Sequence, residues 1–196
     1  MSFCYDKVMN TYVVLIRGIN VGGNNKVPMA VLRECLLDAG FSDVQTYIAS
    51  GNVILKTDKS PTDTKDVIEE LLPKKFKLNS DLIKVLILTN DQIYTVVKNK
   101  PEGFGEEPEK YNSDAIFLMN VPVDTALDAF SPKEGVDKVW EGDGVIYSQR
   151  LTSEKTKSRL GKIISSPLYK SMTIRSWNTT SKLFHILQKE KEEESR

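Results

Sequence analysis

The sequence predicts an α+β protein made of two tandem ferredoxin-like halves, each an antiparallel sheet with the order β-α-β-β-α-β plus a further helix. The first observation is size, because 196 residues, 40% of them hydrophobic, can fill one large or two small cores. The second is that short β-branched runs alternate with segments whose apolar residues recur at helical spacing. The third is that this order repeats after a turn-rich acidic segment at 101–108, although the halves share no residue-level identity. We therefore expect an N-terminal domain over 1–100, a linker over 101–112 and a C-terminal domain over 113–196.

The elements of the first half follow from apolar runs and from residues that begin or end helices. Pro28 suits the first helical position and Gly40 the end of that helix, whereas Ser60 and Asn90 are typical helix caps. The turn at 49–52 joins two strands as a hairpin. In order, we expect strand 12–16, a helix from 28 to 40, strands 44–48 and 53–55, a helix from 60 to 72, strand 82–88 and a short helix that stops before Pro101.

The second half repeats these signals. Turn residues at 142–144 predict a hairpin, and Asn178 has the position of a cap for the last helix. The expected order is strand 115–119, helix 124–130, strands 136–140 and 145–148, a helix marked by Leu160, Ile163 and Ile164, strand 172–175, and a helix with Leu183, Phe184 and Leu187. Aliphatic residues on both faces of the first sheet indicate that both faces are covered, the second by the other domain or by a helix.

Composition excludes several classes of protein. The formal net charge is zero, which argues against a general nucleic-acid coat protein. The cysteines are Cys4 and Cys35 and the one histidine is His185, so no disulfide framework, zinc spacing or Cys–His nucleophile is indicated. No stretch has the apolar length of a membrane span, and the N-terminus lacks the regions of a signal peptide. We expect a cytoplasmic protein with no cofactor, metal or membrane partner; its oligomeric state and whether it is an enzyme stay open.

The most informative motif is the loop at 17–26, which places three glycines between an apolar strand and a helix. Glycines allow a positive φ or a close approach to a ligand, and the N-terminus of the following helix suits an anion. In the predicted topology this loop meets the hairpin at 49–52 and the connection at 73–81, which contains Lys74, Lys75 and Lys77, at one end of the sheet. Convergent polar loops on a rigid sheet are the usual form of a binding site.

These loops form a candidate site for a small anionic, phosphate-bearing ligand, with a nucleotide as one candidate. It is neither a P-loop nor a dinucleotide fingerprint, because Asn24-Asn25 stands where Lys-Ser/Thr is needed and G-x-G-x-x-G is absent. The alternative is that the glycines and the Ser-Gly-Asn turn serve only tight connections. The ligand-binding candidates are Arg17, Gly18, Asn20, Gly22, Gly23, Lys26, Ser50, Gly51 and Asn52, with Arg175, Trp177 and Lys182 from the other half.

Two other functions stay open. Residues 150–182 carry eight Lys or Arg against Glu154 alone, which suits a nucleic acid; residues 101–143 carry eleven acids against three Lys and offer internal partners instead. The aliphatic strands of the first sheet lack the aromatic platform on which RNA-binding versions of this fold stack bases. The second alternative is a protein-interaction module without catalysis, in which Trp177 is an anchor rather than a core residue.

Three motifs in the chain resemble one family. The first two are Arg17-Gly18-Ile19-Asn20-Val21-Gly22-Gly23 with Asn25-Lys26-Val27 and Met29, and Thr46-Tyr47-Ile48-x-Ser50-Gly51-Asn52-Val53. The third is Thr173-x-Arg175-Ser176-Trp177-Asn178-Thr179 with Lys182-Leu183, where Ser176 replaces the family's Asn. Together they resemble the bacterial family known only as domain of unknown function 1697, from residue 10 to the last helix. The resemblance implies two ferredoxin-like domains in a cytoplasmic bacterial protein, no established activity, and a usual start near the first strand, so that residues 1–8 are extra and Met9 is an alternative start.

Overall fold

The computed structural model describes residues 8–79 and 83–194, and within them it confirms the α+β class with two four-stranded antiparallel sheets. The chain divides into two compact units, residues 1–90 and 91–196. Each unit holds one of the two sheets. In the segment 101–112, Phe104 is fully buried and residues 111–112 already belong to a strand. The predicted domain limits and linker stay a prediction.

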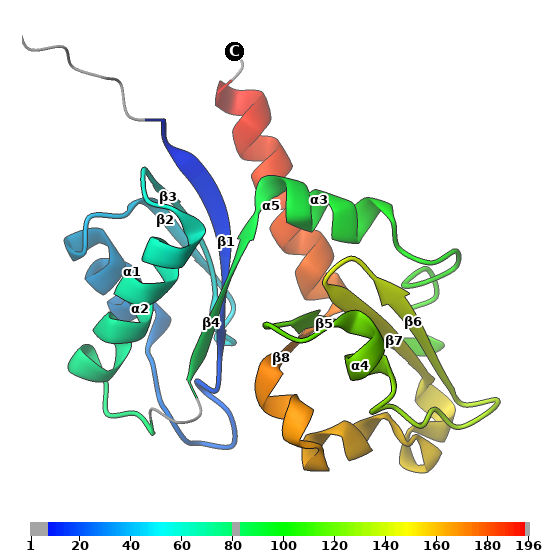
Figure 1. Cartoon of the computed structure of the whole chain (residues 1–196). Coiled ribbons are helices and arrows are strands. Elements are labelled where there is room, and N and C mark those ends of the chain that lie inside the picture. Colours follow the sequence, from blue (N-terminus) through cyan, green and yellow to red (C-terminus); the bar gives the residue numbers. More distant parts are fainter. Residues whose placement is uncertain (1–7, 80–82, 195–196) are drawn as a thin grey trace, which may run out of the picture. The chain divides into compact units, whose positions relative to one another are not determined.

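The first unit places its helices on its sheet in the order that the sequence predicts (Figure 1). Its sheet has the strand order β2-β3-β1-β4, so β1 lies at the centre, antiparallel to both neighbours. Its elements are β1 (Asn10–Arg17), α1 (Met29–Asp38), β2 (Ser42–Tyr47), β3 (Asn52–Thr57), α2 (Pro61–Lys75) and β4 (Lys84–Thr89). The predicted cap of α2 is confirmed, because the Ser60 hydroxyl accepts a hydrogen bond from the Asp63 N–H at 3.1 Å.

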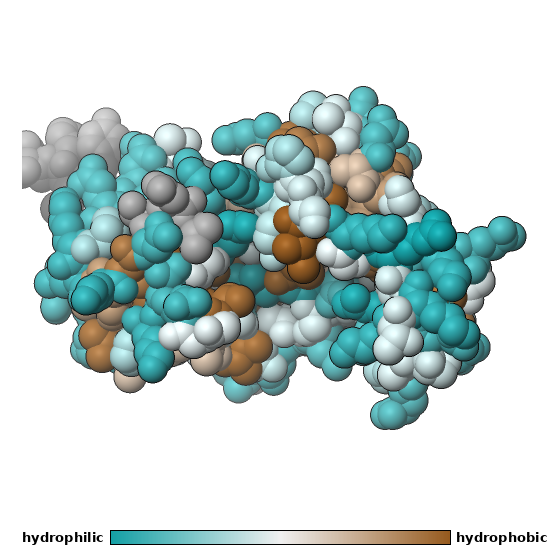
Figure 2. Space-filling model, turned by 90° about the horizontal axis from the view of Figure 1, so that it is seen from below, coloured by the Kyte–Doolittle hydropathy of each residue, from teal (hydrophilic) through white to brown (hydrophobic). Residues whose placement is uncertain are grey.

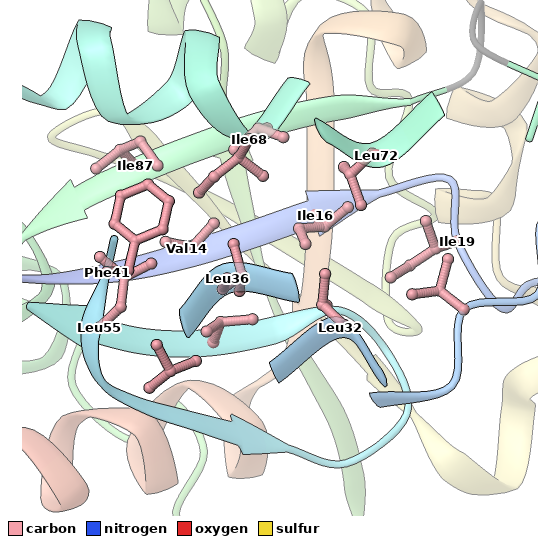
Figure 3. Close-up of a cluster of buried hydrophobic side chains, with 14 of the residues drawn as sticks. Val14, Ile16, Ile19, Leu32, Leu36, Phe41, Leu55, Ile68, Leu72 and Ile87 are labelled. Atoms are coloured by element: carbon pink, nitrogen blue, oxygen red, sulfur yellow. The ribbon is translucent and has the colours of Figure 1, made fainter. Parts of the chain in front are cut away.

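The core of the first unit lies between its sheet and helices α1 and α2. Figure 3 shows Val14 and Ile16 of β1 facing Leu36 of α1 and Ile68 of α2, all of them buried. The alternate residues Val13 and Leu15 are buried as well, so side chains on both faces of β1 are excluded from solvent, as predicted. β1 is therefore a buried central strand, and the loop at 18–28 begins directly after its last residue, Arg17.

The second unit has the strand order β6-β7-β5-β8, again antiparallel throughout. Its elements are α3 (Asn90–Lys98), β5 (Tyr111–Leu118), α4 (Val123–Leu127), β6 (Asp137–Gly142), β7 (Val145–Leu151), three 3₁₀ turns η2 (Thr152–Lys157), η3 (Leu160–Ser165) and η4 (Pro167–Ser171), β8 (Met172–Ser176) and α5 (Trp177–Glu194). One core lies between this sheet and α4, η3 and η4. No helix in the described part of the chain is long and apolar enough to cross a membrane.

Three local predictions are corrected. The helix expected around Leu160 is a 3₁₀ turn, because Ser166 precedes Pro167 and takes an extended conformation that ends η3. Helix α5 is capped by Ser176 rather than Asn178, since the Ser176 hydroxyl accepts from the Thr179 N–H at 3.3 Å. Asn90 begins α3 as a helical residue, and its buried Oδ1 finds no hydrogen-bond partner among the described residues, so it is not a cap.

Candidate functional site

The loop after β1 is a short hairpin held in a left-handed backbone. Gly18, Gly22 and Gly23 have positive φ, as the sequence predicts, and Asn20 and Asn25 share this conformation, which asparagine tolerates better than most residues. Hydrogen bonds from the Asn20 N–H to the Asn25 carbonyl (3.0 Å) and within the turn close the hairpin. A Cβ added at Gly22 or Gly23 would meet no described atom within 4 Å, so these glycines serve φ and leave the turn open on its outer side.

The Asn20 side chain fastens this loop to two other segments. Its Nδ2 donates to the Val27 carbonyl (2.9 Å) and to the Ala49 carbonyl (2.8 Å), and its Oδ1 accepts from the Val27 N–H (2.8 Å). Both polar atoms of the carboxamide are therefore used on backbone groups. The Asn20 side chain therefore links the start of the loop, the segment that enters α1 and the β2–β3 turn.

Asn25 makes the corresponding link to the third connection. Its Nδ2 donates to the Gly18 carbonyl and its Oδ1 accepts from the Asn79 N–H, both at 2.8 Å. The predicted convergence of three connections is thus confirmed for the described residues (Figure 1). The third connection was predicted to span residues 73–81. Residues 73–75 belong to α2 instead, and residues 80 and 81 lie outside the described residues.

The β2–β3 turn packs directly on the end of β1. The Ile16 N–H donates to the Gly51 carbonyl at 2.7 Å, and a Cβ at Gly51 would lie 2.6 Å from the Ile16 carbonyl oxygen. Asn52 is buried and donates through Nδ2 to the Tyr47 carbonyl (3.1 Å) and to the exposed Ser50 hydroxyl (2.9 Å). Gly51 and Asn52 therefore shape the turn, and Ser50 presents its side chain at the tip.

Positive charge gathers at this end of the first unit. Arg17 is half-buried and is the cross-strand partner of the exposed Lys84, which brings two cations to the same end of the sheet. Lys26 and Lys77 are exposed on the two linked loops. Figure 2 views this end, where hydrophilic side chains lie among scattered hydrophobic ones. An anion at this surface would meet several cations and no acid of the loop at 17–26, which contains none.

Helix α1 opens beside these cations without a capping side chain. Pro28 occupies the cap position in an extended conformation, makes no side-chain cap, and no acidic residue follows in the first turn of this fully described helix. The first backbone N–H groups of a helix need acceptors, and the helix dipole favours an anion there. The open helix start adds donors to the positive end of the unit.

The three candidates from the other half lie in the second unit. Arg175 of β8 is buried, donates to the Thr173 hydroxyl (3.0 Å) and the Ile174 carbonyl (2.9 Å), and burial lowers its pKa to about 10. Trp177 is buried with its ring centroid 5.1 Å from that of Phe104, so it is a core residue. Lys182 is exposed on α5. His185 is exposed on the same helix, as expected.

The basic segment at 150–182 is partly neutralised inside its own unit. Arg150 pairs with Asp114 at 3.0 Å, which joins the basic segment to the acidic one as the internal alternative predicts. Lys157 pairs with Glu154 at 2.7 Å, and Arg175 is buried. Three of the eight cations are thereby removed from a continuous phosphate-binding surface.

Sequence reasoning missed Asp114, Ser148 and Arg150, which line one cavity of about 120 Å³ in the second unit. Asp114 and Ser148 are opposite each other on β5 and β7. Burial raises the pKa of the Asp114 carboxyl against the opposing attraction of Arg150. A signal was present, because Asp114 alternates in phase with the buried Ile116 and Leu118 and therefore points to the core side of β5.

Comparison with known proteins adds a family and a fold. Residues 9–147 match the family described as protein of unknown function (DUF1697). A solved structure of the conserved bacterial protein SP0830 from Streptococcus pneumoniae has a TM-score of 0.76 and 25% sequence identity, over 92% of this chain and 99% of that one. No curated protein matches the sequence.

Proposed function

The chain belongs to the DUF1697 family, whose description gives no function, and from this premise we propose that it binds a small anionic, phosphate-bearing ligand at the loop end of the first unit. One observation carries the proposal. The loops at 18–28, 48–51 and 76–79 are hydrogen-bonded into one surface through Asn20 and Asn25, at the end of the sheet where Arg17 and Lys84 are cross-strand partners.

The proposal gives the candidate residues two kinds of role. Arg17 and Lys26 supply positive charge to the phosphate, and the backbone N–H groups of Gly22 and Gly23 and of the first turn of α1 supply donors. Ser50 adds a hydroxyl at the edge of the site. The remaining candidates of the first unit, Gly18, Asn20, Gly51 and Asn52, hold the loops in place, and Arg175, Trp177 and Lys182 are left without a role in this site.

We also infer the ferredoxin-like plan for each unit and a cytoplasmic location. The strand orders β2-β3-β1-β4 and β6-β7-β5-β8, with antiparallel neighbours and helices in the predicted order, support the plan. The location is supported by a sequence with only two cysteines, too few for a disulfide framework. A rigid sheet of this kind holds three loops at one end without requiring a ligand to order them.

The test is a thermal-shift series with pyrophosphate, ATP, glucose 6-phosphate and a short single-stranded RNA. A phosphate compound at about 100 times its dissociation constant stabilises the native state by roughly 2.7 kcal/mol, which is readily measured. Charge reversal in Lys26→Glu should abolish the shift. Lys170→Glu changes another exposed lysine, in the second unit, and as the matched control should keep the shift.

The outcomes separate the open alternatives. A shift from one small phosphate compound that Lys26→Glu removes and Lys170→Glu retains supports the proposed site. A shift with RNA alone, weakening as salt is added and sensitive to Lys170→Glu, moves the function to the basic segment of the second unit. No shift with any phosphate compound, with both variants folded, overturns the proposal and favours a protein-interaction module.

A further inference from the structure

The cavity in the second unit has an apolar body and a polar end. It lies on the core face of the sheet beneath η3, with a volume of about 120 Å³. Asp114, Ser148 and Arg150 form its polar end. The rest of its lining is apolar, from the sheet, the segment after α4 and η3: Ile116, Phe130, Leu160, Ile163, Ile164 and Ile174. Ligand pockets have this composition, in which mostly hydrophobic walls surround a few convergent polar groups.

The polar end carries one charge of each sign and an unused donor. Arg150 Nη2 donates to Asp114 Oδ2 at 3.0 Å, and both side chains are about three-quarters buried. Arg150 Nε is buried and has no hydrogen-bond partner among the described residues. A buried N–H group without an acceptor destabilises the protein, and the N–H groups of a buried ion pair are normally hydrogen-bonded. The Arg150 guanidinium carries five N–H donors, of which its bond to Asp114 uses one, so Arg150 can bind a further acceptor at the cavity that it lines.

A ligand that matches this end must bring an acceptor for Arg150 without leaving Asp114 against a second negative charge. An α-amino acid meets both requirements, because its carboxylate and its ammonium group lie one carbon apart. The carboxylate can accept from the Arg150 guanidinium, and the ammonium can donate to the Asp114 carboxylate, which has acceptor capacity beyond its bond to Nη2. The existing ion pair is kept, so the ligand adds to the pair rather than competing with it.

The size of the cavity limits the side chain of the ligand. A cavity of roughly 150 Å³ lined by Leu, Ile and Phe is known to hold benzene. The slightly smaller cavity here suits a branched aliphatic side chain, which the aliphatic and Phe130 walls would contact. We propose that the second unit binds a small apolar α-amino acid of the leucine class, with its charged groups at Asp114 and Arg150 and its side chain beneath η3. This site lies in the second unit, so it is distinct from the proposed phosphate site.

Calorimetry with leucine and two truncated analogues tests the charge recognition. 4-Methylpentanoate lacks the ammonium group and 3-methylbutylamine lacks the carboxylate, while both keep the apolar body. We expect leucine to bind and each analogue to bind at least about tenfold more weakly, as loss of a charge-assisted hydrogen bond predicts. Analogues that bind as tightly as leucine, or no binding of leucine, would overturn the proposal.

A pair of variants tests the place of binding without disturbing the ion pair. Gly161 lines the cavity, has an ordinary φ, and a Cβ added there meets no described atom within 4 Å, so Gly161→Leu should fold and adds an apolar side chain at the cavity wall. Lys162→Leu adds the same side chain to the neighbouring exposed position, which does not line the cavity. Loss of leucine binding in Gly161→Leu but not in Lys162→Leu supports the site. Retained binding in a folded Gly161→Leu protein would place the ligand elsewhere and refute the assignment.

Discussion

Alanine at Gly51 should destabilise the first unit much more than alanine at Gly23, although the two glycines have nearly the same φ, 76° and 79°. The left-handed conformation costs a non-glycine residue about 1–2 kcal/mol, and both variants carry this cost. At Gly23 nothing further is expected, because a Cβ meets no described atom within 4 Å. At Gly51 the Cβ would lie 2.6 Å from the backbone oxygen of Ile16, and relieving such overpacking adds about 1–3 kcal/mol.

The expected losses of unfolding free energy are thus about 2–5 kcal/mol for Gly51→Ala and about 1–2 kcal/mol for Gly23→Ala. Hydrogen exchange of the β1 and β3 amides measures both in the same unit, where the register pairs Val14 with Val53 beside the turn. Comparing two glycines in one unit removes effects that both share. If the two variants lose the same free energy within about 0.5 kcal/mol, the close approach of the turn to β1 adds no steric cost at Gly51 and the reasoning is refuted.

Three further predictions follow from single side chains. Asn20→Ala should lose about 2–3 kcal/mol in a urea titration, because three backbone hydrogen bonds depend on its carboxamide, whereas the exposed Asn24→Ala should change little. Burial raises the pKa of Tyr147 from 10 to about 12, so its contribution to stability is complete below pH 10 and is lost as the pH rises toward 12. In an absorbance titration, Tyr147→Phe should remove one phenol that ionises at about pH 12. Burial opposes ionisation of Asp137, but hydrogen bonds that include the Arg159 and Lys133 N–H groups lower its pKa overall; stability should fall as the pH drops below its ordinary value of 3.8, and Asp137→Asn should flatten that acid limb. An acid limb unchanged in Asp137→Asn would show that these bonds do not favour the charged form.

The parts of the fold that local chemistry determines were predictable. Ser60 predicts the start of α2, because a hydroxyl three residues before an acid can cap a helix. The structure contains the expected hydrogen bond from the Asp63 N–H to the Ser60 hydroxyl. The meeting of three loops follows from strand direction alone and is confirmed through Asn25 and Asn79. These inferences need only spacing along the chain and the alternation of strand direction.

The features that sequence reasoning missed depend on contacts and backbone geometry that only the folded chain determines. Leu160 and Ile163 have helical spacing, but that spacing does not distinguish an α-helix from a 3₁₀ turn interrupted before Pro167. Asn20 reads as a candidate ligand group because its amide can face either a ligand or the backbone, and only the fold shows that it contacts Val27 and Ala49. The ion pair between Asp114 and Arg150 could not be predicted from spacing, because the two residues are 36 positions apart.

The hydrogen bond from the Asn79 N–H to Asn25 has a consequence for the order in which the first unit folds. The two residues are 54 positions apart, so the loop at 18–28 acquires its last restraint only after α2 has formed and the chain beyond it has returned to the sheet. During synthesis the loop leaves the ribosome long before this partner does. The β1 end and the β2–β3 turn can associate early, whereas the finished loop surface is a late product of folding, and a chain arrested before residue 79 would carry the motif without its native conformation.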